Sequence, residues 1–322
     1  IRFYLKIRLL RIKTIDDLQR KIIKGKVLEW VVDKTTSGLT FSGFENIVPG
    51  RAHLFITNHR DIVLDPAFIC YVLIDECMKA PEIAIGDNLL VNDLVSDLIR
   101  VNKCFIVKRN LPVRERLKAS LELSEYIWYT LSRGISVWIA QRSGRAKDGD
   151  DRTNPSIIKM LYMSQRKGGL EFSDFINACH VIPVAVSYEL DPCDKLKARE
   201  LSKKQINGTY EKRKNEDLLS MVKGIKGHKA RVHVSFGTEL NSRWKSVREV
   251  VEAIDRAIHK LYRLWPSNYI AYDVLTKSNK FTHHYTEEDA NTFLRRFRFL
   301  PDNLRNIVME IYSRPVMNKE AL

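Results

Sequence analysis

Short apolar runs alternate with stretches of helical periodicity through the middle of the chain, and this alternation limits the folds that the sequence can adopt. Brief apolar runs that end at polar residues or glycine predict β-strands. The run Ile135–Ala140 is apolar almost throughout, which is typical of a strand buried on both faces. Strands that alternate with helices predict an α/β fold with a largely parallel central sheet flanked by helices. The expected strands are Gly38–Phe44, Ala52–Thr57, Ile83–Ile85, Cys104–Lys108, Ile135–Ala140, Val181–Tyr188 and Arg231–Phe236.

Helix starts are marked by capping residues. Asp65 followed by Pro66 predicts an N-cap with proline at the first helical position. Ser246 and Glu249 form the pattern of a capping box ahead of another helix. The polar stretch from Asp191 to about Lys229 yields no predicted element. Helical periodicity also marks Leu94–Val101, Leu111–Leu131 and Ile157–Ser164.

Three parts are expected along the chain. Residues 1–36 form a basic amphipathic helical segment, residues 37–245 the α/β domain, and residues 246–322 a C-terminal helical extension. In the first part, apolar residues from Leu18 to Val32 fall on one helical face, and Thr14 is the expected N-cap. Nine Lys or Arg lie within the first 26 residues, against two Asp. Such a helix either lies in the headgroup layer of a membrane or packs on its own domain, and the sequence leaves both open.

The overall charge restricts the partners. The chain carries 54 Lys and Arg against 39 Asp and Glu, a net charge of +15, which attracts nucleic acid, anionic lipid or an acidic carrier protein. The sequence contains no nucleic-acid recognition motif, so no nucleic acid is expected as a partner. The five cysteines lack metal-ligand spacing and indicate thiols buried in a reducing compartment. Because no apolar stretch approaches the roughly 20 residues of a membrane span, we expect a cytoplasmic protein with peripheral membrane contact.

Three polar clusters follow predicted strands, at the strand ends where open α/β sheets place their sites. They are Asn58–Asp65, Lys108–Arg109 and Gln141–Lys147. In the first cluster, the neutral imidazole of His59 can take a proton from a substrate hydroxyl, while a carboxylate on its other nitrogen fixes the tautomer. Asp65 and Asp61 both compete for that role. The alternative is that Asp65 only caps a helix and that His59 binds a loop carbonyl.

The first cluster carries a family resemblance. Phe55-Ile56-Thr57-Asn58-His59 with Asp65-Pro66-Ala67 resembles the signature block of the glycerol-phosphate and lysophosphatidate acyltransferase family. The resemblance implies that His59 and Asp65 form the catalytic dyad and that the neighbouring Asn58 and Arg60 bind substrate. In the family four residues separate the histidine from the aspartate, whereas five separate them here. Asp65 is favoured over Asp61, although its spacing requires a one-residue bulge.

The other two clusters are similar to the family's phosphate-binding blocks. Ile85–Leu89 followed by Phe105–Arg109 resembles the second block, which implies that Arg109 or Lys108 contacts the acceptor's phosphate. Trp138–Lys147 occupies the place of the Glu-Gly-x-Arg-Ser block, but its glutamate is missing and Gln141 or Ser143 stands there. Gly144 and Arg145 are the best remnant of that block, and Arg142 and Lys147 are further phosphate-binding candidates.

The resemblance extends from about Gly38 to Leu240, through strands Val181–Tyr188 and Val232–Phe236. It implies transfer of a fatty acyl group from acyl-CoA or acyl-carrier protein to a glycerophosphate-type hydroxyl. Lysophosphatidate is the favoured acceptor and glycerol-3-phosphate the next. No metal or redox cofactor is expected, and the expected partners include an anionic membrane surface. The alternatives are acylation of another lyso-lipid such as an amino-acid-containing lipid, a catalytically degenerate lipid-binding scaffold, and a basic nucleic-acid-binding protein.

Overall fold

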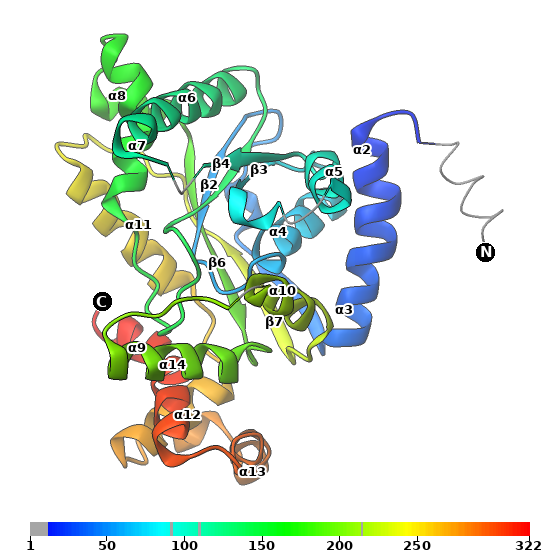
Figure 1. Ribbon diagram of the computed structural model, residues 1–322, viewed down its shortest axis with the longest axis vertical. Helices are drawn as coiled ribbons and strands as arrows, with labels where there is room; N and C mark the ends of the chain where they lie inside the picture. The colour runs from blue at the N-terminus through cyan, green and yellow to red at the C-terminus, as the bar shows by residue number, and fades with distance from the viewer. Residues whose placement is uncertain (1–11, 91–92, 109–110, 214) are drawn as a thin grey trace.

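The computed structural model describes residues 12–90, 93–108, 111–213 and 215–322. Within these residues seven strands form one sheet, in the order β1-β7-β6-β2-β5-β3-β4 (Figure 1). Neighbouring strands are parallel except for β6 and β7, which are antiparallel. The predicted α/β fold with a largely parallel sheet is therefore confirmed. The strands are β1 Gly38–Ser42, β2 Leu54–Thr57, β3 Glu82–Gly86, β4 Cys104–Val107, β5 Val137–Ala140, β6 Val181–Tyr188 and β7 Arg231–Phe236.

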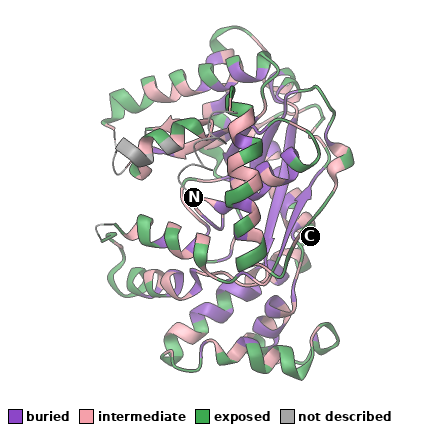
Figure 2. Cartoon of the chain, turned by 90° about the vertical axis from the view of Figure 1, so that its right-hand side faces the viewer, coloured by how far each residue is buried: buried purple, intermediate pink, exposed green. Residues whose placement is uncertain are grey.

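Helices cover both faces of the sheet. Successive strand residues point to opposite faces, and apolar side chains on each face pack against helices. Phe55 packs on one face in a core with helix α4 (Leu64–Asp75), whereas Leu54 and Ile56 pack on the other. The sheet is the most deeply buried layer of the molecule (Figure 2). The second face is covered by helices α6 Val113–Ser132, α7 Pro155–Lys167, α8 Phe172–Ala178 and α11 Val247–Leu261.

The N-terminal helical segment packs on its own domain. It runs through α2 (Ile15–Leu18), η1 (Gln19–Leu28, with π-helical hydrogen bonding) and α3 (Glu29–Thr35). Thr14 caps it as predicted, since its side chain accepts a hydrogen bond from the Asp17 amide. Val31 enters the core beside α4, and Lys24 forms an ion pair with Asp75 at 2.7 Å. Val27 and Trp30 stay 47% exposed, so the segment keeps an apolar outer surface.

The polar stretch after β6 contains two helices that the sequence did not predict, α9 (Asp194–Asn207) and α10 (Glu216–Lys226). Periodicity missed α9 because its inner face is partly charged. Lys197 is 2% exposed, and its ammonium donates to the carbonyl of Arg60 at 2.7 Å and to Asp191 at 2.5 Å. This lysine ties α9 to the loop after β2.

The chain ends in helices, as predicted, but the first of them, α11, packs on the sheet, and the separate helical extension begins after it. Ser246 caps α11 by accepting from the Glu249 amide. The helices that follow share a small core with Ala198 of α9. None of the described helices has the length and apolar character needed to cross a bilayer. The remaining elements are α5 Asp93–Val101, α12 Pro266–Thr276, α13 Glu287–Arg295 and α14 Asp302–Glu320, with short helical turns η2 Phe44–Asn46, η3 Asp87–Leu89 and η4 Thr282–His284.

Candidate active site

The loop that joins β2 to α4 brings His59 against Asp65. The Nδ1 atom of His59 lies 2.9 Å from Oδ2 of Asp65. The same oxygen accepts hydrogen bonds from the backbone amides of Arg60, at 2.6 Å, and Asp61, at 2.9 Å. Asp65 is fully buried and His59 is 12% exposed on its side chain. A carboxylate held this way accepts a hydrogen bond from the Nδ1–H group and leaves Nε2 as the free base.

Asp65 is not the N-cap that the sequence predicted. Helix α4 begins at Leu64, so Asp65 lies inside its first turn, and its carboxylate turns back to His59. Asp61 takes the capping role, since its Oδ1 accepts from the amides of Val63 at 2.9 Å and Leu64 at 2.8 Å. The two aspartates that competed for His59 in the sequence are thereby separated. Asp65 contacts the imidazole, and Asp61 shapes the loop.

Tyr188, the last residue of β6, binds the other oxygen of Asp65. Its hydroxyl donates to Oδ1 at 2.8 Å. Burial and the negative charges of Asp65 and Asp61 raise the pKa of Tyr188 well above its usual value, so the hydroxyl stays protonated and keeps donating. Burial and the charge of Asp65 also raise the pKa of Asp61. With these four donors, Asp65 has both of its oxygens hydrogen-bonded in the interior.

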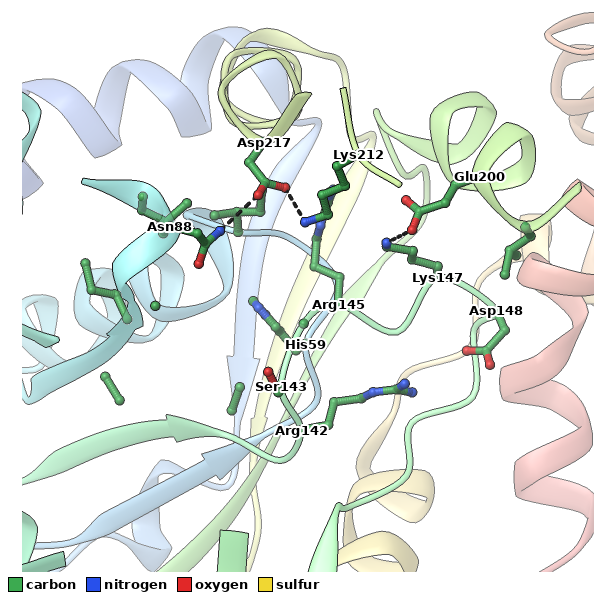
Figure 3. Close-up of a pocket in the computed structure, with 18 of the residues that line it drawn as sticks. His59, Asn88, Arg142, Ser143, Arg145, Lys147, Asp148, Glu200, Lys212 and Asp217 are labelled. Atoms are coloured by element: carbon green, nitrogen blue, oxygen red, sulfur yellow. Dashed lines mark hydrogen bonds and ion pairs between the residues drawn. The ribbon is translucent and has the colours of Figure 1, made fainter. Parts of the chain in front are cut away.

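His59 lies on the wall of a cavity with a volume of about 260 Å³ at the carboxyl ends of β2, β3 and β5. Among the described residues, Nε2 of His59 has no hydrogen-bond partner, and Trp138 packs edge-on against the ring at 6.2 Å. The cavity is lined by four residues that the sequence singled out for substrate binding (Figure 3): Arg142, Gly144, Arg145 and Lys147. The loop after β5 therefore brings basic side chains to the cavity that His59 lines.

The four predicted residues that line the cavity differ in the hydrogen bonds and ion pairs that they make within the protein. Arg142 donates to the carbonyl of Asp150 at a long 3.5 Å, and Lys147 forms an ion pair with Glu200 of α9. Arg145 makes no hydrogen bond or ion pair with any described residue, although its guanidinium is half-buried. Gly144 has a left-handed φ of 75°, which favours glycine in the turn ahead of Arg145. An unpaired guanidinium on a cavity wall is suited to an anionic ligand.

Asn58 and Arg60, expected to bind substrate, make internal contacts instead. Asn58 is fully buried and bridges β2 to β6 through two hydrogen bonds with the backbone of Val186. Arg60 is 8% exposed and forms an ion pair with Asp151 at 2.6 Å, below the ring of Tyr262. Both side chains are used in holding the loop, and neither lines the cavity. The prediction of substrate contact is wrong for these two residues.

Lys108, the described residue of the second polar cluster, does not line the cavity of His59. Lys108 is exposed and lines a different, mainly apolar groove of about 500 Å³ between β4, α6 and α7. Arg109, the favoured residue of that cluster, lies outside the described residues. The groove and the cavity share Ser143, so they meet beside the loop after β5.

Other residues of the cavity were not predicted from the sequence. Five come from the region of α9 and α10: Glu200, Leu201, Lys204, Lys212 and Asp217. Glu200 and Asp148 place carboxylates in the cavity, whereas Gln141, at the position of the missing motif glutamate, is fully buried outside it. The described residues contain no cluster of His, Cys, Asp and Glu suited to a metal ion.

Part of the chain is similar to a known family. Residues 38–187, from the start of β1 to the end of β6, match the family described as Acyltransferase. A comparison with curated proteins gives no significant match. Among solved structures, the chain is similar to the 1-acyl-sn-glycerophosphate (LPA) acyltransferase PlsC from Thermotoga maritima. The identity is 13%, the coverage 80% of this chain and 86% of that chain, and the TM-score 0.48. The family match covers slightly less than half of the chain, and it contains His59, Asp65 and the loop after β5.

Proposed function

We propose that the protein transfers a fatty acyl group from an acyl thioester to the hydroxyl of a glycerophosphate-type lipid acceptor, with lysophosphatidate favoured and glycerol-3-phosphate next. One observation carries this proposal. The His59–Asp65 pair lies on the wall of a cavity that also holds an unpaired arginine, Arg145. A base and an anion-binding group in one cavity suit an acceptor that carries a hydroxyl and a phosphate.

In the chemical step, Nε2 of His59 takes the proton of the acceptor hydroxyl as its oxygen attacks the thioester carbonyl carbon. The tetrahedral intermediate collapses by breaking the carbon–sulfur bond, and the imidazolium returns the proton to the thiolate that leaves. An ester and a free thiol result, and no metal or redox cofactor takes part. Asp65 stabilises the imidazolium, because its carboxylate lies 2.9 Å from Nδ1.

The basic residues of the cavity position the acceptor. Arg145 binds the phosphate, and Arg142 and Lys147 add charge from the same loop. Fixing the phosphate holds the hydroxyl at Nε2 of His59, which converts a chance encounter into a reaction within one complex. Lys108 is assigned no contact with the acceptor in this arrangement, and the phosphate contact of Arg109 stays a prediction.

The acyl chain of the donor occupies the apolar groove that meets the cavity at Ser143. Its walls carry Phe105 and Ile106 of β4, Leu123 of α6, and Ile157 and Met160 of α7. Burying methylene groups there is favourable by about 0.8 kcal/mol for each CH₂. The donor is acyl-CoA or an acyl-carrier protein, and the positive charge of the chain suits the acidic character of either.

The protein works at the cytoplasmic face of an anionic membrane, to which it binds peripherally. The start of α6 supports this placement, because Val113 and Leu117 are 78% and 66% exposed beside the exposed Arg114, Arg116 and Lys118. Apolar side chains among basic ones bind the headgroup layer of anionic bilayers. The same helix lines the apolar groove with Leu123, so lipid can reach the groove from this surface.

The test is an acceptor panel with the purified protein. Acyl-CoA and acyl-carrier-protein donors are incubated with lysophosphatidate, glycerol-3-phosphate, an amino-acid-containing lyso-lipid and monoacylglycerol, and the products are read by mass spectrometry. We expect ester formation only with phosphate-bearing acceptors, and an acceptor KM raised about tenfold or more in Arg145→Ala. Equal rates with monoacylglycerol, or an unchanged KM in Arg145→Ala, would overturn the proposed phosphate site.

A further inference from the structure

The roof of the cavity comes from a part of the chain beyond the 38–187 family match. Helices α9 and α10 and the loop between them bring Glu200, Lys212 and Asp217 to the cavity above His59 (Figure 3). Helix α10 is packed tightly on the catalytic loop, since a Cβ atom at Gly224 would lie only 2.2 Å from Oδ2 of Asp61. The roof therefore has a fixed position relative to His59.

Three cations meet under this roof: Arg145, Lys147 and Lys212. All three side chains line the same cavity. Burial lowers the pKa of Lys147, and the charges of Lys212 and Arg145 act in the same direction against the opposing effect of Glu200. Two carboxylates offset two of the charges, because Glu200 binds Lys147 and Asp217 accepts from Lys212 at 2.7 Å. Arg145 forms no ion pair with a described residue, although its charge acts to lower the pKa of Asp61, Asp191 and Asp217. Arg142 and Lys204 also line the cavity, and so does Asp148, so five Lys or Arg residues of the lining face three carboxylates. The excess of positive charge attracts an anion.

Lys212 can leave Asp217 for another anion at little cost. The Lys212 side chain is 45% exposed, and an ion pair this exposed to solvent contributes little. Asp217 has a second hydrogen bond, from Asn88 Nδ2 at 2.9 Å, so it stays in place without the lysine. Lysine also has three N–H donors, and only one is used by Asp217.

We propose that Lys212 is a further ligand of the acceptor's phosphate, held ready by Asp217 until the phosphate binds. This inference rests on the proposed function, because it assigns a residue outside the acyltransferase match to the same acceptor. The phosphate approaches Arg145 and then gains the ammonium of Lys212 from above. Asp217 opposes this binding, since its negative charge competes for Lys212 and repels the incoming phosphate.

The experiment measures binding and turnover separately. Calorimetry with glycerol-3-phosphate, lysophosphatidate and inorganic phosphate, without a donor, gives Kd for the wild type, Lys212→Ala, Lys212→Arg and Asp217→Asn. Lys226→Ala, an exposed lysine of α10 that does not line the cavity, is the matched control. Acceptor KM and kcat are then measured with the same variants, and thermal unfolding shows that each is folded.

We expect Lys212→Ala to raise Kd and acceptor KM about tenfold with kcat little changed, and Lys212→Arg to restore most of the binding. Asp217→Asn should shift Kd the opposite way, toward tighter binding. If Lys212 only fastened the loop to α10, both substitutions would weaken binding alike, and that result overturns the inference. An unchanged Kd in Lys212→Ala also overturns the inference. The proposed function still holds in that case, provided that the wild-type protein binds the phosphate compounds and transfers the acyl group. A wild type that binds no phosphate compound and transfers no acyl group overturns both.

Discussion

Oδ2 of Asp65 lies 2.9 Å from Nδ1 of His59 and also accepts hydrogen bonds from the backbone amides of Arg60 and Asp61. One carboxylate oxygen thus holds both the imidazole and the loop that carries it. Five residues separate His59 from Asp65, and Asp61 caps the turn within that loop. The side chain that orients the base also fixes the backbone around it, so the catalytic geometry and the loop conformation depend on the same atom.

Asp65→Asn should lower kcat by about 100-fold or more and change the acceptor KM little, because the amide cannot stabilise the imidazolium. Steady-state kinetics with saturating donor measure both constants. Asp61→Asn is the matched control, since asparagine also caps turns and Asp61 does not contact the imidazole. An equal loss of kcat in the two variants would contradict the assignment of Asp65 as the partner of His59.

Arg60→Met should destabilise the fold and leave the acceptor KM of the folded protein unchanged. The substitution strands the charge of Asp151, which is 2% exposed, and breaking a buried ion pair costs about 3–5 kcal/mol. Urea unfolding gives the free energy change. Arg152→Ala is the control, because that arginine is 72% exposed on its side chain and its ion pair should be worth under about 1 kcal/mol. A large rise in KM with unchanged stability would return Arg60 to the substrate site.

Met160→Trp should shift the donor preference toward shorter acyl chains. Met160 lines the apolar groove, and a larger side chain there fills space that the last methylenes need. Competition between long-chain and short-chain acyl-CoA, read by mass spectrometry, should show the kcat/KM ratio falling about tenfold or more. Leu219→Trp, at a 57% exposed position of α10, should leave the ratio as it is. An unaltered ratio in Met160→Trp would place the acyl chain elsewhere.

The sequence predicted the sheet and the contact between His59 and Asp65 because both rest on short-range patterns. Apolar runs located all seven strands, and the motif around His59 located the dyad that the loop then assembled. Side-chain direction was harder to predict. Asn58 and Arg60 stand on either side of His59 in the sequence. Because successive side chains at a strand end point to opposite sides, these two point away from His59 and into the protein interior.

The roof of the cavity could not be predicted for a different reason. Glu200 and Lys212 lie 55 and 67 residues after Arg145, in a stretch where α9 shows weak apolar periodicity. Their place beside Arg145 follows from how α9 and α10 pack, and Lys197 and Gly224 make that packing specific. A buried lysine and a helical glycine give little signal in a single sequence.

Stability should fall as the pH is lowered from about 6.5 to about 4. Burial and the charge of Arg263 lower the pKa of His233 to about 4, while the unfolded chain keeps the ordinary value. In this window the unfolded state binds the proton and the native state does not, so acid favours unfolding. Urea midpoints measured across the range should fall less steeply for His233→Gln, whose amide can still bind Thr40 and Ser42. Identical pH profiles for the two proteins would contradict this role of His233.

The most direct test is single-turnover acyl transfer by the purified His59→Ala protein, with donor and acceptor saturating and the ester product followed by mass spectrometry. His228→Ala, at an exposed histidine away from the cavity, is the control. The account predicts that the His59→Ala rate falls by about 100-fold to 10,000-fold while its unfolding curve and phosphate binding stay close to those of the wild type. A folded His59→Ala protein that transfers the acyl group at the wild-type rate would contradict it.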